Sequence, residues 1–167
     1  ERKKCVFVWG EQGIGDQIMF ASIIPELYRF SSKVIVQCDD RLIPLFQRSF
    51  PDDVVYYRTN VTVHEDYYDY HIPAGSLSLK FRTTLDSFKS TSSGFLLPNK
   101  QRAEDIRKNI LVGPKKNLIG LSWKTNSNVP NAQNRNIKLA DLALALDSID
   151  TQLVSLQYGD VGEEIKA

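Results

Sequence analysis

Three glycines and a carboxylate stand close together near the start of the chain, in the stretch Gly10-Glu11-Gln12-Gly13-Ile14-Gly15-Asp16. An apolar run, residues 5–9, comes before the stretch, and a helical apolar pattern, residues 17–30, follows it. A glycine-rich turn between a strand and a helix lets the backbone take positive φ and lets another molecule approach closely. The helix start adds unpaired N–H groups and a partial positive charge. The stretch therefore constrains the fold to a strand–turn–helix unit and predicts a binding site.

Strands and helices are predicted to alternate along the first part of the chain. The predicted strands are residues 5–9, 33–38, 53–57 and 67–72, and the predicted helices are residues 17–30 and 41–50. Pro25 is expected to bend the first helix or end its first part, and Asp39-Asp40 to cap the second. Residues 73–76 are predicted as a turn and residues 87–94 as a polar surface loop. This alternation favours an α/β fold with a Rossmann-like, doubly wound parallel sheet.

A second α/β unit is predicted to begin after a break at residues 113–117. Its expected elements are a strand at 118–123, a loop at 124–136, a helix at 138–147 and a strand at 152–156, and a helix at 101–111 precedes the break. We therefore predict a domain at 1–112, a hinge at 113–117 and an incomplete domain at 118–167. Because the chain opens on Glu1 and the second unit looks unfinished, we expect a fragment of a longer polypeptide.

Charge and composition narrow the classes of partner. With 21 Lys and Arg against 20 Asp and Glu, the net charge of +1 gives no reason to expect nucleic acid or an anionic membrane surface as a partner. No apolar run reaches the ~20 residues of a membrane span. The two cysteines, Cys5 and Cys38, lie in predicted strands and fit a reducing cytoplasm. We interpret His64 and His71 as structural and predict no metal site.

Asp16 allows three interpretations of the glycine stretch. In the first, the glycines form a dinucleotide-binding loop, and Asp39 or Asp40 binds a ribose. In the second, Asp16 is a general base, because a helix start favours its ionised form and flanking glycines admit a substrate hydroxyl. In the third, Asp16 only caps the helix.

A second candidate site follows the predicted strand at 118–123, at the edge where open α/β sheets bind ligands. Lys124 and Arg135 have the charge to neutralise a phosphate, and asparagine amides nearby have hydrogen-bonding groups to offer it. The alternative interpretation is a solvated surface loop with two ordinary basic residues.

In motif order and spacing, the chain resembles the heptosyltransferase-like glycosyltransferases, especially the variants fused behind tetratricopeptide repeats. The residues that carry the resemblance are Gly10 to Gln17, Ile72-Pro73-Ala74-Gly75-Ser76-Leu77, Ile119-Gly120-Leu121-Ser122-Trp123, and Asn134-Arg135-Asn136-Ile137 with Leu156-Gln157. The chain departs from the family pattern at residues 135–138, where Arg-Asn-Ile-Lys replaces Lys followed by an aromatic residue and proline. The family's later donor-binding segment has no counterpart in the chain.

The resemblance implies a GT-B arrangement, in which two Rossmann-like domains bind an acceptor and a nucleotide-sugar donor. It implies Asp16 as the general base, with Gly13, Gly15 and Gln17 beside the substrate, and no metal or other cofactor. It places Ser122, Lys124, Thr125 and Arg135 near the donor. The expected partners are a nucleotide sugar, a glycan or protein acceptor, and an adjacent tetratricopeptide-repeat domain, and the chain alone is expected to be inactive.

The sequence is therefore compatible with three functions. The first is metal-independent sugar transfer to an acceptor hydroxyl. The second is dinucleotide binding by a Rossmann module, and the third is a noncatalytic α/β binding domain.

Overall fold

The computed structural model describes residues 4–11, 13–91, 94–111, 113, 117–125, 130–147 and 150–166. The chain divides into two compact units, Glu1–Asn99 and Lys100–Ala167, and each is described by itself. The predicted hinge, residues 113–117, lies mostly outside the described residues. Within the described ranges, no helix has the length and apolar character needed to cross a membrane.

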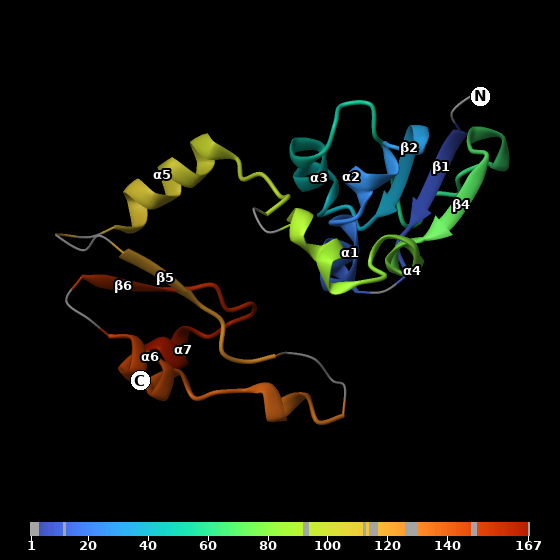
Figure 1. The fold of residues 1–167 in the computed structure, drawn as a ribbon. Coiled ribbons are helices and arrows are strands. Elements are labelled where there is room, and N and C mark those ends of the chain that lie inside the picture. The colour runs from blue at the N-terminus through green and yellow to red at the C-terminus, as the bar shows by residue number, and fades with distance from the viewer. Residues whose placement is uncertain are drawn as a thin grey trace. The chain divides into compact units, whose positions relative to one another are not determined.

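The first unit is built on a four-stranded parallel sheet with the strand order β3-β2-β1-β4 (Figure 1). Its strands are β1 (Lys4–Trp9), β2 (Ser31–Cys38), β3 (Val55–Arg58) and β4 (Tyr70–Pro73). Its α-helices are α1 (Ile14–Ala21), α2 (Ile24–Leu27), α3 (Ile43–Ser49) and α4 (Ser78–Phe81). Its 3₁₀ helices are η1 (Glu65–Tyr67), η2 (Ala74–Leu77) and η3 (Leu85–Thr91). This strand order confirms the Rossmann-like α/β fold.

Local sequence signals explain the helix boundaries of the first unit. Pro25 ends the first helical part as predicted, because α1 stops at Ala21 and Pro25 lies in the first turn of α2. The prediction that Asp39-Asp40 caps α3 is wrong. Leu42 is the N-cap residue of α3 and makes no side-chain cap, while Asp39 Oδ1 accepts a hydrogen bond from Arg41 N at 3.0 Å.

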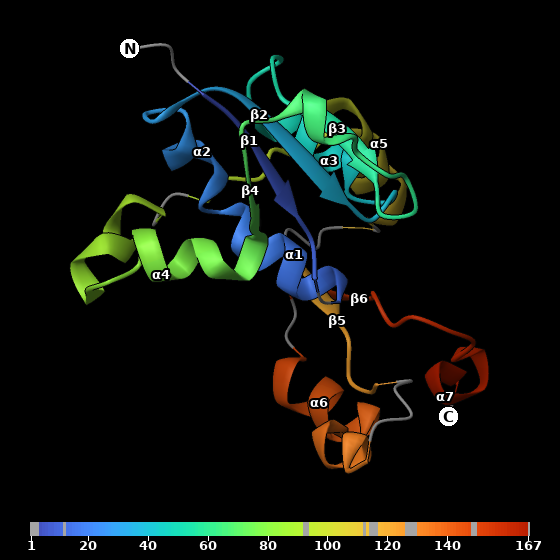
Figure 2. The ribbon, with the colours of Figure 1, turned by 90° about the vertical axis from the view of Figure 1, so that its right-hand side faces the viewer.

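The segments around β4 are more helical than the sequence indicated. Residues 73–76, predicted as a turn, lead from the end of β4 into η2, and η2 continues directly into α4 (Figure 2). The predicted polar loop at 87–94 begins inside η3. These short helices lack a long apolar repeat, so periodicity could not find them.

The helices α1, α2 and α3 cover one face of the sheet, as Figure 1 shows. Val8 and Val36 point to that face and pack in the main core with Ile24 and Phe46. Burying each such side chain stabilises the fold by about 1.5–3 kcal/mol.

The other face of the sheet carries Phe7 and Ile35 and is contacted by the connection between β3 and β4. Val63 of that connection is buried against them, and the Phe7 and Tyr68 ring centroids lie 5.1 Å apart. Ile35 is buried together with its neighbours in β2, which accounts for the continuous apolar run of this strand.

The second unit contains a two-stranded parallel sheet formed by β5 (Asn117–Leu121) and β6 (Thr151–Ser155). Its helices are α5 (Lys100–Ile110), η4 (Ala132–Arg135), α6 (Leu139–Leu146) and α7 (Gly162–Lys166). Leu139, Leu142 and Leu146 of α6 pack on a small core of Leu121, Trp123 and Val161. The predicted strand–helix–strand order of this unit is confirmed.

Candidate functional site

The winding of the first sheet places two connections at one edge. β1 and β4 are parallel neighbours, with Val8 beside Ile72 and Trp9 beside Pro73, so both strands end at the same edge. From β1 the chain continues through α1 to β2 on one side, while β4 lies on the other side of β1. The strand order thus changes direction at β1, and open α/β sheets bind ligands at such a point. We call residues 10–17 and 74–77, which follow β1 and β4, the switch-point segments.

The glycines of the first switch-point segment do not use positive φ. Gly13 is the N-cap residue of α1 and has φ −62° and ψ 168°, an extended conformation open to any residue. Gly10 and Gly15 likewise lie outside the positive-φ region. The prediction of positive φ in this turn is therefore wrong.

Gly10 makes room for a side chain of the same segment. A Cβ atom at Gly10 would lie 2.9 Å from Gln17 Cδ, closer than such atoms approach. Gln17 Oε1 accepts a hydrogen bond from the Asp39 backbone N–H at 2.8 Å. The Gln17 side chain therefore joins α1 to Asp39, the residue after β2. Gly10 was predicted to leave space around Asp16, but the space at Gly10 is filled by the Gln17 side chain.

Asp16 is the third residue of α1 and is half-buried. It is not the N-cap, so the prediction of a simple cap is wrong, but a carboxylate in the first turn is favoured by the helix dipole. A Cβ at Gly13 would lie 3.6 Å from Asp16 Oδ2, and nothing lies within 4 Å of a Cβ at Gly15. Among the described residues, no hydrogen bond or ion pair engages Asp16. The position that a side chain at Gly15 would occupy is therefore open.

Glu11 and Gly75 were not among the predicted site residues, although both lie in quoted motifs. A Cβ at Gly75 would lie 3.2 Å from Glu11 Oε2 and 3.4 Å from Phe20 Cε2. The contact joins the two switch-point segments, which are about sixty residues apart in the sequence. Only the pairing of β1 with β4 reveals it, so the sequence signal was limited to a glycine after a predicted strand.

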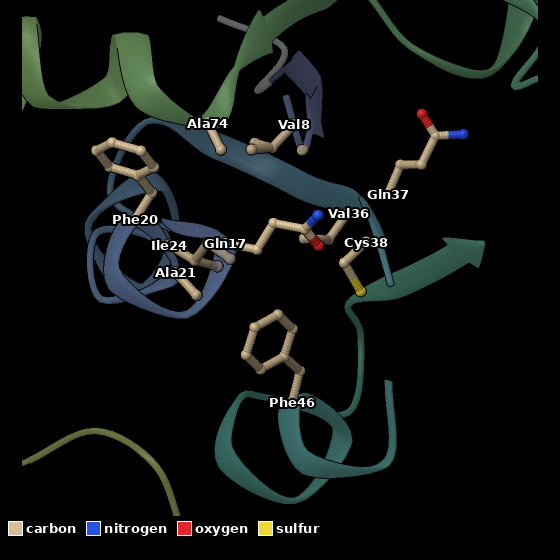
Figure 3. A pocket seen from close by; sticks show the side chains of 11 residues that line it. Val8, Gln17, Phe20, Ala21, Ile24, Val36, Gln37, Cys38, Phe46 and Ala74 are labelled. Atoms are coloured by element: carbon tan, nitrogen blue, oxygen red, sulfur yellow. The ribbon is translucent and has the colours of Figure 1, made fainter. Parts of the chain in front are cut away.

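A small cavity lies behind the first switch-point segment (Figure 3). Its volume is about 10 Å³, which is the space of roughly one water molecule. Figure 3 shows Gln17 extending toward the end of β2 and Phe46 closing the other side, while Gln37 points away. A substrate does not fit there.

The residues after β2 are engaged with arginines. Asp39 accepts hydrogen bonds from Arg41 Nε and Nη2, both at 2.9 Å, and Arg41 lowers the pKa of Asp39 to about 2. Asp40 Oδ2 lies 3.5 Å from Arg58 Nε. A ribose would have to compete with these arginines for the carboxylates of Asp39 and Asp40.

In the second unit, the residues after β5 are held by one glutamine that the sequence analysis did not assign to the site. Gln157 Oε1 accepts hydrogen bonds from the backbone N–H groups of Trp123 and Lys124, at 2.9 and 3.0 Å. Gln157 Nε2 donates to Lys124 O at 2.9 Å, and Ser122 Oγ lies 3.3 Å from Gln157 Oε1. Gln157 therefore fastens the end of β5 to the chain that leaves β6.

Lys124 is paired with a carboxylate of α7. Lys124 Nζ lies 2.5 Å from Glu164 Oε2, and the buried Trp123 donates its Nε1–H to Glu164 Oε1 at 2.8 Å. Hydrogen bonds from Lys124 and Trp123 lower the pKa of Glu164. A phosphate would have to compete with Glu164 for Lys124.

The structure brings Thr125 next to the residue that follows Arg135. Thr125 N donates to Asn136 Oδ1 at 2.9 Å, and Asn136 Nδ2 donates to Gln133 Oε1 at 2.8 Å. Arg135 lies on η4 and is exposed. The predicted loop residues 126–129 lie outside the described residues.

The second unit also contains a mostly apolar cavity of about 310 Å³. It is lined by Leu121, Trp123, Leu139, Ala140, Ala143, Leu153, Val154, Ser155, Glu164 and Ile165. Across the described parts of both units, no group of three or more His, Cys, Asp or Glu side chains is arranged to hold a metal ion.

Fold and site define an α/β protein with a Rossmann-like parallel sheet and a second, smaller parallel sheet. No family model and no solved structure matches the chain. The chain is similar to Protein FlbA of Caulobacter vibrioides, with 29% identity over an alignment 191 residues long that covers 98% of this chain. It spans about 30% of the length of FlbA. The name of that protein states no activity or substrate.

Proposed function

We propose that the chain is part of a metal-independent glycosyltransferase, in which Asp16 acts as the general base on an acceptor hydroxyl. The observation that carries the proposal is the position of Asp16, which lies in the first turn of α1 at the switch point and makes no hydrogen bond or ion pair among the described residues. Carboxylates are typical general bases, and one in the first turn of a helix interacts favourably with the helix dipole. The resemblance to heptosyltransferase-like enzymes supports this role.

In the proposed reaction, Asp16 removes the proton of the acceptor hydroxyl as its oxygen attacks the anomeric carbon of the donor. The bond from that carbon to the diphosphate oxygen breaks, and the nucleoside diphosphate leaves with the electron pair. The second unit would bind the donor, with Lys124 near the diphosphate and Ser122, Thr125 and Arg135 nearby. The ion pair between Lys124 and Glu164 would break, and Lys124 would contact the phosphate oxygens instead.

Dinucleotide binding is the second candidate function. The switch point lies where such a module holds a pyrophosphate, and α1 begins there. Two observations favour the transferase instead: Asp16 places a negative charge at this helix start, and the carboxylate of Asp39 is engaged with Arg41. The noncatalytic binding domain is the third candidate.

Release of nucleoside diphosphate from UDP-glucose, GDP-mannose and ADP-glucose tests the proposal in a polypeptide that carries this chain with a complete donor-side domain. Asp16→Asn should lower turnover by about 100-fold or more, the contribution typical of a general base. Circular dichroism and donor binding should stay unchanged. Turnover that survives in Asp16→Asn would exclude Asp16 as the base, and fluorescence enhancement with NADH alone would favour the dinucleotide module.

A further inference from the structure

Arg82 is a buried basic residue of the first unit that the proposed reaction does not use. It is the C-cap residue of α4, and its side chain is only 4% exposed. Its Nη1 group donates hydrogen bonds to Glu26 Oε1 of α2 and to the carbonyl oxygen of Phe81, the latter at 2.9 Å. The ion pair therefore joins the end of α4 to α2.

The second terminal nitrogen of the Arg82 guanidinium group, Nη2, is buried as well. Among the described residues it has no hydrogen-bond partner. A guanidinium group offers five N–H donors and no acceptor, and a buried donor without a partner loses the hydrogen bonds that water would supply. Nη2 is therefore a charged donor that lacks an oxygen acceptor in this conformation.

The ring of Phe88, in η3, lies over this guanidinium group. Arg82 Cζ is 5.5 Å from the ring centroid, which is a cation–π contact. The apolar side chains of η3 bury little surface, because Leu85 is 88% exposed and Phe88 is 52% exposed. Segments with few buried apolar contacts open at a low cost in free energy. Opening of η3 would therefore uncover Arg82.

The charges of the residues near this ion pair favour an anion once η3 has opened. Arg29 and Lys80 are exposed cations, three residues after Glu26 and two residues before Arg82. Asp86 belongs to η3 and would move with it. The two segments left behind carry three cations and one carboxylate, so they attract negative charge.

We propose that Arg82 is a covered anion-binding residue and that η3 is its lid. When Phe88 leaves the guanidinium group, Nη2 binds an oxygen atom of a carboxylate or phosphate group. Both groups carry charged oxygen acceptors, which form short and strong hydrogen bonds with a guanidinium. Since Phe88 and the anion exclude each other, binding of the anion shifts the lid toward its open position. The inference goes beyond sugar transfer and does not depend on it.

Acetate and inorganic phosphate, each titrated at constant ionic strength into the chain of residues 1–167, test this inference. Binding is followed by the Arg82 side-chain Nε–H and the Ser87 amide in ¹⁵N–¹H correlation spectra. We expect Phe88→Ala to bind at least one of the two anions about 10-fold more tightly than the unmodified chain, because it removes a cation–π contact that competes with the anion. The anion that binds more tightly identifies the chemical class of the ligand.

Leu85→Ala is the matched control, because Leu85 is an apolar residue of the same 3₁₀ helix and is almost fully exposed. It should leave anion binding unchanged. Arg82→Lys, combined with Phe88→Ala, keeps a positive charge beside Glu26 but removes Nη2, so it should weaken anion binding about 10-fold. Glu26→Gln removes the carboxylate that repels the anion and should tighten binding a few-fold.

Three results would overturn the inference. The first is the absence of any anion-dependent shift in Phe88→Ala, and the second is equal affinity in the unmodified chain, Phe88→Ala and Leu85→Ala. The third is undiminished binding after Arg82→Lys. Circular dichroism shows whether each variant is folded. If the Arg82→Lys variant does not fold, Glu26→Gln decides, and anion binding that it leaves unchanged or weakens would remove Arg82 from the site.

Discussion

The side-chain oxygen of Gln17 accepts the backbone N–H of Asp39 at 2.8 Å, and this bond joins the start of α1 to the end of β2. Gly10 faces the same side chain, since a Cβ at that position would meet Gln17 Cδ at 2.9 Å. The glycine and the glutamine therefore act as a pair. They fix the first switch-point segment over the small cavity shown in Figure 3.

Gln17→Ala should destabilise the first unit by about 1–2 kcal/mol, because the Asp39 N–H loses its partner. Gly10→Ala should have a similar cost, because its methyl group displaces Gln17. In the Gln17→Ala background, Gly10→Ala should cost much less, which gives a coupling energy of about 1 kcal/mol. Urea unfolding followed by amide resonances of the first unit measures all four variants, and additive costs would refute the pairing.

The pKa of Asp39 should be about 2, because Arg41 donates three hydrogen bonds to its carboxylate. The folded pKa is lower than that of the unfolded chain, so the ionised carboxylate stabilises the fold above about pH 4. This stabilisation should disappear as the pH falls toward 2. Carboxyl ¹³C shifts of Asp39 measure the titration, and Arg41→Ala should raise the midpoint. An unaltered midpoint in that variant would contradict the assigned cause.

Gln157→Ala should destabilise the second unit by about 1–3 kcal/mol, because it removes the partner of the Trp123 and Lys124 N–H groups. Gln157→Glu keeps the acceptor oxygen but loses the donation to Lys124 O, so its cost should also be positive. Hydrogen exchange of the Trp123 and Lys124 amides is the measurement. Exchange rates equal to those of the unmodified chain would show that Gln157 does not fasten the two strand ends.

Glu164→Gln should raise the affinity of the second unit for UDP about 2- to 5-fold, because it removes the carboxylate that competes for Lys124. The hydrogen bonds that lower the pKa of Glu164 keep it ionised at neutral pH. Acidification should therefore release Lys124 only below the ordinary glutamate range. Calorimetric titration with UDP compares the variant with Lys124→Ala, which should weaken binding, and with Glu163→Gln as control. Equal UDP affinity in all three would remove Lys124 from the donor site.

Strands and their order of appearance were predictable from the sequence, because β1, β2 and β5 each contain an apolar run of strand length. The position of Pro25 in α2 was also predictable, since proline ends helices by a local clash. These features depend on residues next to one another in the chain.

The partners of the site residues were not predictable, because they depend on contacts between distant segments. Gly10 lies where a ligand-binding glycine is expected in the sequence, yet it faces Gln17. Only the position of Asp39, directly after β2, explains this contact. Lys124 has the charge for a phosphate, but its pairing with Glu164 joins residues forty positions apart. Glu11 and Gly75 came together only through the pairing of β1 with β4.

The pairing of β1 with β4 also has a consequence for how such a protein diversifies. Trp9 and Pro73 are aligned in the ladder, so the roots of the two switch-point segments are held about 4.8 Å apart by backbone hydrogen bonds alone. Side chains beyond these roots do not set that spacing. Substitutions at the partly exposed Gly75 and Ser76 can therefore change the side chains at this edge, while the backbone of residues 10–11 keeps its place.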